Sequence, residues 1–396
     1  MQTFKIKTYK RKRIHVLYQI SVMSMSVEES LRIASDVHKH VRKRLSDSNM
    51  LTAGMRLVDI ANFIETETKE HASTILDAVN GIVPNSVSTI NGGIGFPVGL
   101  SINNCAAHYH PHSLDMDRIL SNSDILKVDF GTEINGWIID SAFTTRIASG
   151  DDKNNYHRNN NATIEYSKHS FDVDDCESLI SCMKDATELG VRNIGIDVRI
   201  AEWSASIEEL VRSHDGVHPI YNLTGHDILH EIIHGNVRLP SVGKAVDNKN
   251  ERFKAGVYAI ETFGARLPPK AVRTNGEEMQ VEVEESGEST IFRLAPELSK
   301  YTAQELQAHF RTPIFRIQSV QKIFSQIGKR FRTLPFCERY LQPSDRTPLS
   351  ILVKNGAVMS YPPLCCTAGS ITAQFEHTVL LKDSGTVTVF SKDDDY

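Results

Sequence analysis

The stretch DFGTEINGWIID, residues 129–140, places two carboxylates in apolar strand sequence on either side of an Asn-Gly turn. Asn-Gly between apolar runs is a strong hairpin signal, because both positions of a two-residue loop need positive φ. Such a loop pairs Gly131 with Asp140. Asp129 lies two residues before Gly131 and shares its face, so the two aspartates become diagonal neighbours roughly 5–8 Å apart at Cβ.

Two like charges this close on a half-buried sheet repel each other and are costly to desolvate. A metal ion bound between Asp129 and Asp140 would remove both costs. The alternative is that the two carboxylates are exposed at strand ends.

Three further segments each place an ionisable residue inside apolar strand sequence, where an unpaired charge is rarely buried. They are the segments 225–226, 259–264 and 374–378. Four carboxylates and one imidazole suit two divalent ions, with manganese, iron, cobalt and zinc as candidates. Two metals sharing a hydroxide form a hydrolytic centre. The complete set is Asp129, Asp140, His226, Glu261 and Glu376.

The composition of the chain limits the classes of protein to which it can belong. Its 396 residues are 40% hydrophobic and 23% charged, which is enough for one large or two ordinary globular domains. The net charge of −5 gives no indication of nucleic-acid binding. No apolar run approaches the length of a membrane span. The six cysteines form no C-x-x-C pair, so we expect neither a zinc knuckle nor a disulfide framework. We also expect a cytoplasmic location.

Residues 1–27 form a basic N-terminal extension without any acidic residue. We expect it to be disordered, or to result from a misassigned start, with Met23 or Met25 as the true one. An organellar transit peptide and a ribosome-contacting arm are the alternatives.

The remaining pattern mixes helices and hairpins without a steady βαβ alternation, which predicts an α+β fold rather than a doubly wound sheet. Apolar residues recur at helical spacing over 27–45 and 57–64, on either side of a loop at Gly54. Residues 149–178 are polar and Asn-rich and predict a surface loop. We expect helices at 179–190 and through most of 302–342, and strands over 90–146, 217–264, 373–381 and 386–390.

The chain resembles the type 2 methionine aminopeptidases. The resemblance covers roughly residues 28–396, apart from the Asn-rich loop and part of 270–320. It rests on several stretches that occur together and in order, namely GIGFPVGLSINNCAAHYHP, ILKVDFGTEINGWIIDSAFT, GIDVRI, LTGHDI, YAIETFG, RTLPFC, YPPL, TAQFEHT and the terminal DDDY.

The resemblance implies a pita-bread fold, in which two pseudo-symmetric halves of a catalytic domain, residues 28–396, enclose the site. Glu261 and Glu376 are 115 positions apart. The two-half core needs only a short connection there, so the excess predicts an inserted helical subdomain over about 270–360, as type 2 enzymes have.

The same resemblance implies two divalent ions per chain, of cobalt, manganese, iron or zinc. Asp129 would chelate one ion, His226 and Glu261 would hold the other, and Asp140 and Glu376 would bridge both. A bridging hydroxide would attack the first peptide bond, with Glu376 as the proton shuttle.

Two further histidines, His108 and His234, match the catalytic histidines of the family that are not metal ligands. They would bind the scissile carbonyl and stabilise the tetrahedral intermediate. The implied reaction removes the initiator methionine from nascent polypeptides with a small second residue. The implied protein is a monomer that acts near the ribosome and not at a membrane. The implied methionine pocket consists of Phe96, Gly99, Ile233, Phe263 and Tyr361.

Two departures from the family pattern concern the pocket and one ligand segment. Type 2 enzymes carry a pocket histidine after the IETFG strand, whereas residues 286–290 here read SGEST and the next histidine is His309. The usual GHSI reads GHDI, which puts Asp227 beside a ligand. Since adjacent strand residues point to opposite faces, Asp227 is expected to face solvent.

Two alternatives compete with this interpretation. His230-Glu231-Ile232-Ile233-His234 matches the zincin signature H-E-x-x-H, with Glu231 as base. The segment is short and rich in β-branched residues, which does not favour a long active-site helix. The second alternative is a non-catalytic pita-bread protein that binds the ribosome or RNA, although such relatives lack ligands that this chain retains.

Other histidines and cysteines near these motifs are expected to have ordinary roles. His110 and His112 are predicted to be surface residues rather than ligands. Cys105 has no identifiable base partner and is expected to be inert packing. Cys365 and Cys366 are expected to pack around the pocket mouth.

Overall fold

The computed structural model describes residues 25–80, 90–112, 118–147, 171–271, 279–310 and 313–392. The predictions made for most of the basic N-terminal extension, and for the Asn-rich loop up to residue 170, lie outside these residues.

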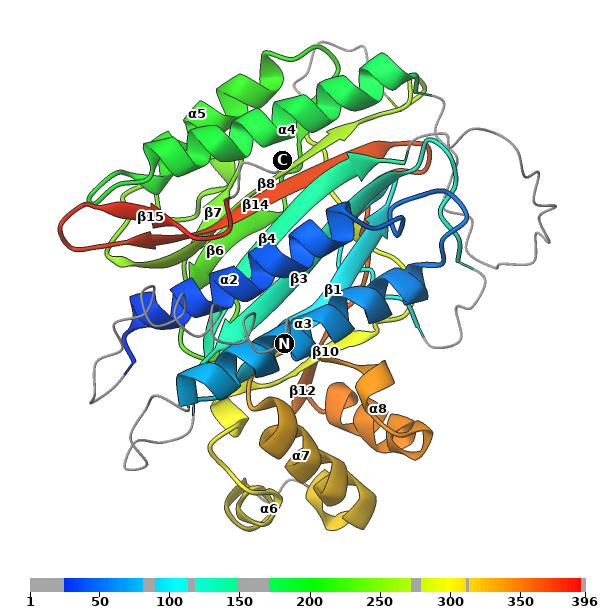
Figure 1. Ribbon diagram of the computed structural model, residues 1–396, viewed down its shortest axis with the longest axis vertical. Coiled ribbons are helices and arrows are strands. Elements are labelled where there is room, and N and C mark those ends of the chain that lie inside the picture. The colour runs from blue at the N-terminus through cyan, green and yellow to red at the C-terminus, as the bar shows by residue number, and fades with distance from the viewer. Residues whose placement is uncertain are drawn as a thin grey trace, which may run out of the picture.

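Two long helices begin the described chain and cover one face of the first sheet (Figure 1). They are α2 (Val27–Ser46) and α3 (Leu57–Asn80), as the apolar periodicity predicts. Ser26 and Glu29 form a capping box that satisfies free N–H groups at the start of α2. The helix buries an apolar stripe that includes Leu31, Ala34 and Leu45.

The first sheet has the order β1-β3-β4 and carries the predicted hairpin. Its strands are β1 (Gly92–Ile102), β3 (Ile125–Ile134) and β4 (Trp137–Arg146), and the short β2 (Cys105–Ala107) follows β1. Gly131 pairs with Asp140 in the predicted register. Asn135 and Gly136 have φ of 51° and 80°, so the two-residue turn with positive φ at both positions is confirmed.

The second half repeats this arrangement of two helices packed on a sheet (Figure 1). The predicted loop is too long at its C-terminal end: α4 begins at Val173, where the Asp172 side chain accepts from the Asp175 N–H and caps the helix. Helix α5 was missed by the sequence interpretation. The elements are α4 (Val173–Asn193), α5 (Ile200–Arg212), β5 (His218–Pro219), β6 (Thr224–Ile228), β7 (Arg238–Pro240), the 3-10 turn η1 (Gly243–Ala245), β8 (Gly256–Arg266), β14 (Ile371–Leu381) and β15 (Val387–Val389).

The two sheets meet where β4 lies beside β14, and hydroxyl groups join them. Thr378 Oγ1 accepts from the Asp140 N–H and donates to the Asp140 carbonyl, both at 2.7 Å. Thr144 Oγ1 does the same for Gln374, at 2.8 and 2.7 Å. Each threonine thus satisfies both backbone groups of a residue across the junction, where a strand ladder would otherwise be needed.

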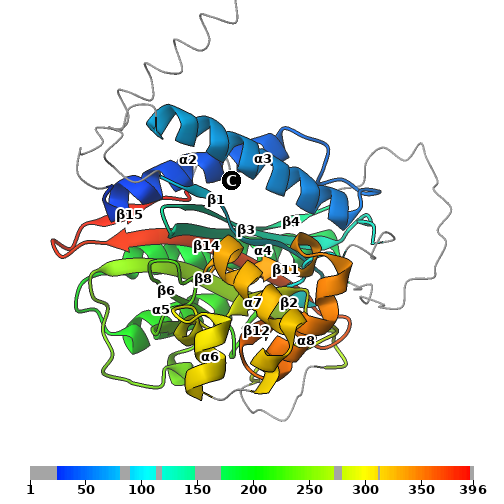
Figure 2. The same cartoon turned by 90° about the horizontal axis from the view of Figure 1, so that it is seen from below.

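Between β8 and β14 the chain builds an insert with its own apolar core, which includes Leu294, Leu306 and Phe324. Figure 2 shows its helices gathered beside the strands of the main sheets, on the side away from α2 and α3. The elements are β9 (Glu284–Glu285), β10 (Ile291–Leu294), η2 (Pro296–Leu298), α6 (Ala303–Phe310), η3 (Pro313–Arg316), α7 (Gln318–Phe331), β11 (Phe336–Cys337), η4 (Glu338–Tyr340), η5 (Pro343–Asp345), α8 (Arg346–Lys354), β12 (Val358–Tyr361) and β13 (Leu364–Cys365).

The mixture of helices and mainly antiparallel sheets confirms the predicted α+β class. In the part of the chain that the structure describes, no helix combines the length and apolar character needed to cross a bilayer.

Candidate active site

All five predicted ligands lie at the junction of the two sheets. Their donor atoms form two groups whose members lie within 4.8 Å of one another. One group contains Asp140, His226 and Glu376, and the other contains Asp129, Glu261 and Glu376. Glu376 belongs to both groups, as expected of a bridging carboxylate. Glu261 lies with Asp129, so the assignment of Glu261 to the same ion as His226 stays a prediction.

The strand register explains why these side chains meet. Glu261 on β8 lies directly opposite Glu376 on β14. The hairpin of β3 and β4 brings Asp129 and Asp140 to the same place from the other half. His226 Nε2 lies 3.6 Å from Asp140 Oδ2. Donor atoms from five strands therefore converge on one point of the interior.

Burial determines the charge state of the carboxylates when no cation is bound. It raises the pKa of Asp129 to about 7, and Gln374 opposes this by donating to the carboxylate. Burial also raises the pKa of Asp140, Glu261 and Glu376 well above the ordinary value, and their mutual repulsion adds to the rise. The protein alone thus holds protons where a divalent cation would stabilise the ionised form.

Several oxygen atoms of this group are buried without a hydrogen-bond partner. They are Oδ1 of Asp129 and both carboxylate oxygens of Glu376. Glu376 is only 1% exposed. Buried polar atoms without partners are costly in a folded protein. Oxygen-rich donors with one imidazole suit a pair of divalent cations, so the residues present fit the metal ions that the sequence implies.

The three histidines of the site are neutral at pH 7. Burial lowers the pKa of His226 and of His108 to about 4, and lowers that of His234 well below its ordinary value. The rings of His226 and His234 lie edge to face at 4.4 Å. Neutral imidazole is the form that ligates a metal or exchanges hydrogen bonds with an amide.

His108 has one fixed and one free ring nitrogen. The ring bonds the backbone carbonyl of Pro362. Because a carbonyl accepts, the bonded nitrogen carries the proton. Nδ1 is buried without a partner and is therefore an acceptor. His108 has a φ of 66°, a left-handed backbone that non-glycine residues seldom adopt and that functional sites often contain.

A cavity of about 410 Å³ opens over the two acidic groups. All the predicted substrate residues line it, together with four of the five predicted ligands. Pro335 and Ile291 also line it, and sequence reasoning missed both of them. Predicted residues that line the cavity are Phe96, Gly99, His108, Asp129, Asp140, His226, Ile233, His234, Glu261, Phe263 and Tyr361.

The pocket contact that the sequence places in doubt stays a prediction. Among the described residues lining the cavity, the histidines are His108, His226 and His234. Apolar side chains of Ile291 and Pro335 form part of the cavity wall. Beside the predicted ligand His226, the Asp227 carboxylate accepts from the Val237 N–H at 2.7 Å, so it has a local structural partner.

The H-E-x-x-H segment does not form a zincin site. Residues 230–234 form a turn rather than a helix. His230 Nε2 lies 2.9 Å from the Asn135 carbonyl, and the Glu231 N–H donates to the Gly136 carbonyl at 2.7 Å. The motif therefore packs against the turn of the aspartate hairpin, and of its residues Ile233 and His234 line the cavity.

The prediction that His110 and His112 lie on the surface is wrong. His110 is fully buried and His112 is mostly buried, because the insert covers the segment that follows β2. Cys105 is buried, and burial raises the pKa of its thiol well above the ordinary value, in agreement with an inert packing role. Leu364 lines the cavity, whereas Cys365 and Cys366 are not among its lining residues.

Sequence reasoning did not single out Gln374 as a site residue. Its Nε2 donates to Glu261 Oε1 at 2.6 Å and lies 3.3 Å from Asp129 Oδ2. One amide thereby orients carboxylates from both halves. The only signal in the sequence was a polar residue two positions before Glu376, on the same face of the strand.

Comparison with known proteins agrees with this geometry. The model of metallopeptidase family M24 matches residues 27–286. The chain is 34% identical to methionine aminopeptidase 2-2 of Talaromyces marneffei, over 92% of this chain and 68% of that protein. It is 35% identical to methionine aminopeptidase 2-2 of Aspergillus niger (93% and 74% covered) and 33% identical to methionine aminopeptidase 2 of Komagataella phaffii (92% and 70%).

Two solved structures share the fold at low sequence identity. The structure of a thermophilic Arx1 has a TM-score of 0.69 at 14% identity, over 94% of this chain and 92% of that one. The methionine aminopeptidase of Rickettsia prowazekii has a TM-score of 0.52 at 13% identity, over 94% and 100%. At these identities the likeness concerns the fold alone.

Proposed function

Because the chain belongs to metallopeptidase family M24, and within it to the type 2 methionine aminopeptidases, we propose that it removes the initiator methionine from nascent polypeptides with a small second residue. The predicted pita-bread fold is confirmed by this membership. The observation that carries the proposal is the convergence of three buried carboxylates, the half-buried Asp129 carboxylate and one neutral imidazole beneath an apolar cavity.

As a member of a metallopeptidase family, the protein uses divalent metal ions. We propose two per chain, of cobalt, manganese, iron or zinc. Asp129 would hold one, His226 and Glu261 the other, and Asp140 and Glu376 both. When bound, such ions supply a hydroxide nucleophile at neutral pH and polarise the scissile carbonyl. The unpartnered oxygens of Asp129 and Glu376 support this assignment.

Glu376 is the residue we assign to proton transfer. It is the carboxylate shared by both acidic groups. A carboxyl of this kind can take a proton from the attacking water and return it to the nitrogen of the leaving peptide.

His234 and His108 would hold the scissile peptide group from two sides. His234 lies against His226 and lines the cavity, where its ring can donate to the carbonyl oxygen as negative charge develops. Nδ1 of His108 is an acceptor, which suits the N–H of the second residue rather than the carbonyl. This changes the role expected for His108 from the resemblance.

The methionine side chain would occupy the apolar part of the cavity. Phe96 and Gly99 supply one side, Ile233 and Phe263 another, and Tyr361 closes the wall near His108 and His234. We further propose that the protein acts as a monomer in the cytoplasm on chains emerging from the ribosome.

The test is release of methionine from Met-Gly peptides by protein loaded with manganese or cobalt. We expect turnover that stops when a chelator removes the metal and returns when metal is restored. Absence of turnover by folded, metal-loaded protein would contradict the proposal and favour a non-catalytic pita-bread protein.

A further inference from the structure

One segment of the insert, residues 332–339, forms part of the cavity wall, and we call it the strap. Pro335 lies within it and lines the cavity. The next two residues form β11, in which Cys337 pairs with Ile291 of β10. Ile291 pairs on its other side with Tyr361 of β12. Three cavity-lining residues, Pro335, Ile291 and Tyr361, thus come from the strap and the small sheet attached to it.

An arginine anchors the first end of the strap to both halves of the catalytic domain. Arg332 Nη2 lies 2.9 Å from Glu133 Oε1 on β3, and Arg332 Nε lies 3.0 Å from Glu231 Oε1 in the turn before His234. The Glu133 side chain is only 7% exposed, and its other oxygen accepts from the Gly136 N–H at 2.8 Å. Since the second carboxylate oxygen is also bonded, this ion pair has a fixed geometry.

The backbone conformation of Arg332 is energetically unfavourable for a residue with a Cβ, so its surroundings must stabilise it. Its φ is 56° and its ψ is −118°, a combination that glycine tolerates and that side chains with a Cβ disfavour. Such a conformation persists only where the surroundings fix it. Here the surroundings include the carboxylates of Glu133 and Glu231, which pair with the Arg332 guanidinium.

A second arginine anchors the other end. Arg339 Nη2 donates to Glu65 Oε1 at 2.8 Å and Nη1 donates to Asn62 Oδ1 at 2.6 Å, both on α3. Arg339 Nε donates to His110 Nε2 at 3.0 Å. Tyr340 Oη also donates to Glu65 Oε1, at 2.8 Å. The Arg339 and Glu65 side chains are 11% and 6% exposed, so water competes little for these bonds.

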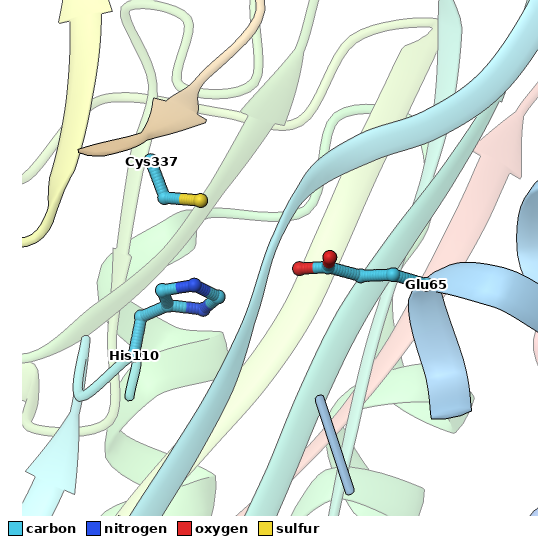
Figure 3. Close-up of side chains that lie close together, drawn as sticks. All are labelled: Glu65, His110 and Cys337. Carbon is cyan, nitrogen blue, oxygen red and sulfur yellow. The ribbon is translucent and has the colours of Figure 1, made fainter. Parts of the chain in front are cut away.

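The side chains around Arg339 have the composition of a metal site, but their polar atoms already have hydrogen-bond partners. Figure 3 shows Glu65, His110 and Cys337 converging from α3, the segment after β2, and β11. The Arg339 guanidinium occupies the positions at Glu65 and at His110 Nε2 that a cation would need. Burial raises the pKa of Cys337 to about 12, so its thiol stays protonated. The cluster therefore holds an arginine rather than a divalent ion.

The second anchor also reaches the opposite wall of the cavity. His110 Nδ1 lies 2.7 Å from the Val98 carbonyl. Val98 lies in the irregular part of β1 between Phe96 and Gly99, where the register with β3 shifts. Both Phe96 and Gly99 line the cavity. The chain of contacts from Arg339 through His110 to Val98 thus links the strap to the wall that faces it.

We propose that the strap determines side-chain specificity, and that Arg332 and Arg339 are positioning residues that fix the width of the apolar cavity. The inference rests on the proposed aminopeptidase function and names the element that selects the methionine side chain. Neither arginine contacts the reacting atoms. Each acts through Pro335, Ile291 and Tyr361 on one wall, and Arg339 acts through His110 on the other.

The test compares Met-Gly-Gly with Leu-Gly-Gly and norleucine-Gly-Gly as substrates for three variants. Arg332→Gly removes the first anchor and leaves a residue that the backbone favours, so folding is preserved. Arg339→Lys keeps the charge of the second anchor but loses its fork of donors. The matched control is Arg316→Met. Arg316 is another insert arginine; it is exposed and lies outside the strap.

We expect the kcat/KM ratio for methionine over leucine to fall about tenfold in each anchor variant, which is the size of effect that pocket shape gives. The fall should come mainly from a higher KM for methionine peptides, and the control should keep the wild-type ratio. Amide hydrogen exchange should become faster at residues 333–337 in both anchor variants, and near Val98 in Arg339→Lys.

The proposal is overturned if both folded anchor variants keep the wild-type ratio, whether or not their melting temperature falls. Failure of wild-type protein to release methionine would instead contradict the proposed function. Hydrogen exchange would then still test the strap. Unchanged exchange at residues 333–337 would show that the arginines do not position it.

Discussion

Glu261 and Glu376 face each other across one rung of the β8–β14 pair, although 115 residues separate them in the chain. The whole insert lies between these two residues, and it returns the chain to the same point of the site. The pairing brings two carboxylates together, and the β3–β4 hairpin adds two more from the other half. Ionising four neighbouring carboxylates whose pKa values are raised is unfavourable unless a cation is bound.

Removal of a shared carboxylate should abolish turnover. We expect Glu376→Ala and Asp140→Ala to lower kcat/KM at least roughly a thousandfold, because each removes a donor that both ions would use. Glu231→Ala is the matched control, since Glu231 contacts the strap and the hairpin turn but neither acidic group. It should keep most of kcat for methionine peptides, with any loss confined to KM, because Glu231 holds Arg332 of the strap. The opposite ranking would support the zincin interpretation.

The two histidines outside the metal site should affect kcat without affecting metal content. His234→Asn is expected to lower kcat by about 10²–10³, the loss that follows removal of one oxyanion donor. His108→Asn should act mainly on peptides whose second residue offers a backbone N–H. Met-Gly peptides, whose scissile nitrogen carries a hydrogen, and Met-Pro peptides, whose scissile nitrogen carries none, provide the comparison. Loss of bound metal in either variant would contradict the assigned roles.

Gln374 should tune metal affinity because it orients Asp129 and Glu261 at once. We expect Gln374→Leu to weaken manganese binding by about 10–100-fold, as loss of a residue that orients ligands does. Isothermal titration measures this directly. Thr388→Val, which changes a half-buried residue of the edge strand β15 in the same sheet, serves as the control. Equal affinity in the Leu variant and the wild type would show that the amide contacts are incidental.

In metal-free protein, the free energy of unfolding should depend on pH because the four carboxyl groups have raised pKa values. Unfolded carboxyl groups titrate near pH ~4, whereas burial raises the pKa of folded Asp129 to about 7 and raises the pKa of its three neighbours well above the ordinary value. Folded protein therefore holds protons that unfolded protein has released, and stability from these groups is lost as pH rises through the folded pKa. The buried histidines, whose pKa is lowered, act in the opposite direction, but only below about pH 6.5.

Comparison of metal-loaded with metal-free protein isolates this effect. As pH rises from the unfolded carboxyl pKa of about 4 towards the folded pKa of about 7 of Asp129, the melting temperature of metal-free protein should fall relative to that of metal-loaded protein, in which cations replace the protons. Groups outside the metal site titrate alike in both samples and cancel in the difference. Parallel curves over this range would show that the four carboxylates are not the groups that the metal occupies.

The hairpin turn provides a test of fold stability. Gly136 has a φ of 80°, and a Cβ there would lie 2.6 Å from His230 Nε2 and 2.8 Å from Glu231 Cγ. Gly54 has a φ of 95° with open space around it. Gly54→Ala should therefore cost about 1 kcal/mol of unfolding free energy. Gly136→Ala should cost about 1–3 kcal/mol more from the clash. Urea denaturation measures both, and equal losses would contradict the packing described at the turn.

Local sequence signals predicted the hairpin and the two N-terminal helices because neighbouring residues determine them. The Asn135-Gly136 turn fixed the register, and the register fixed the common face of Asp129 and Asp140. The burial of His110 was not predictable in this way. It depends on the insert, whose Arg339 lies 229 positions away in the chain.

Long-range contacts also explain why the sequence did not predict the residues that position the site. Gln374 and Thr378 resemble ordinary polar strand residues until β14 is placed beside β4 and β8. Arg332 resembles a surface residue at the end of a helix, although its partners lie in both halves of the catalytic domain. The family resemblance predicted the ligands, whereas the contacts that hold these side chains required the structure.

A titration that follows bound manganese and released methionine in the same samples tests the central claim most directly. We expect two ions per folded chain and methionine release from Met-Gly-Gly that rises with metal bound at Asp129, Asp140, His226, Glu261 and Glu376. Asp129→Ala should bind at most one ion tightly. Protein that binds two ions without releasing methionine, or that releases methionine with its metal removed, would contradict the account.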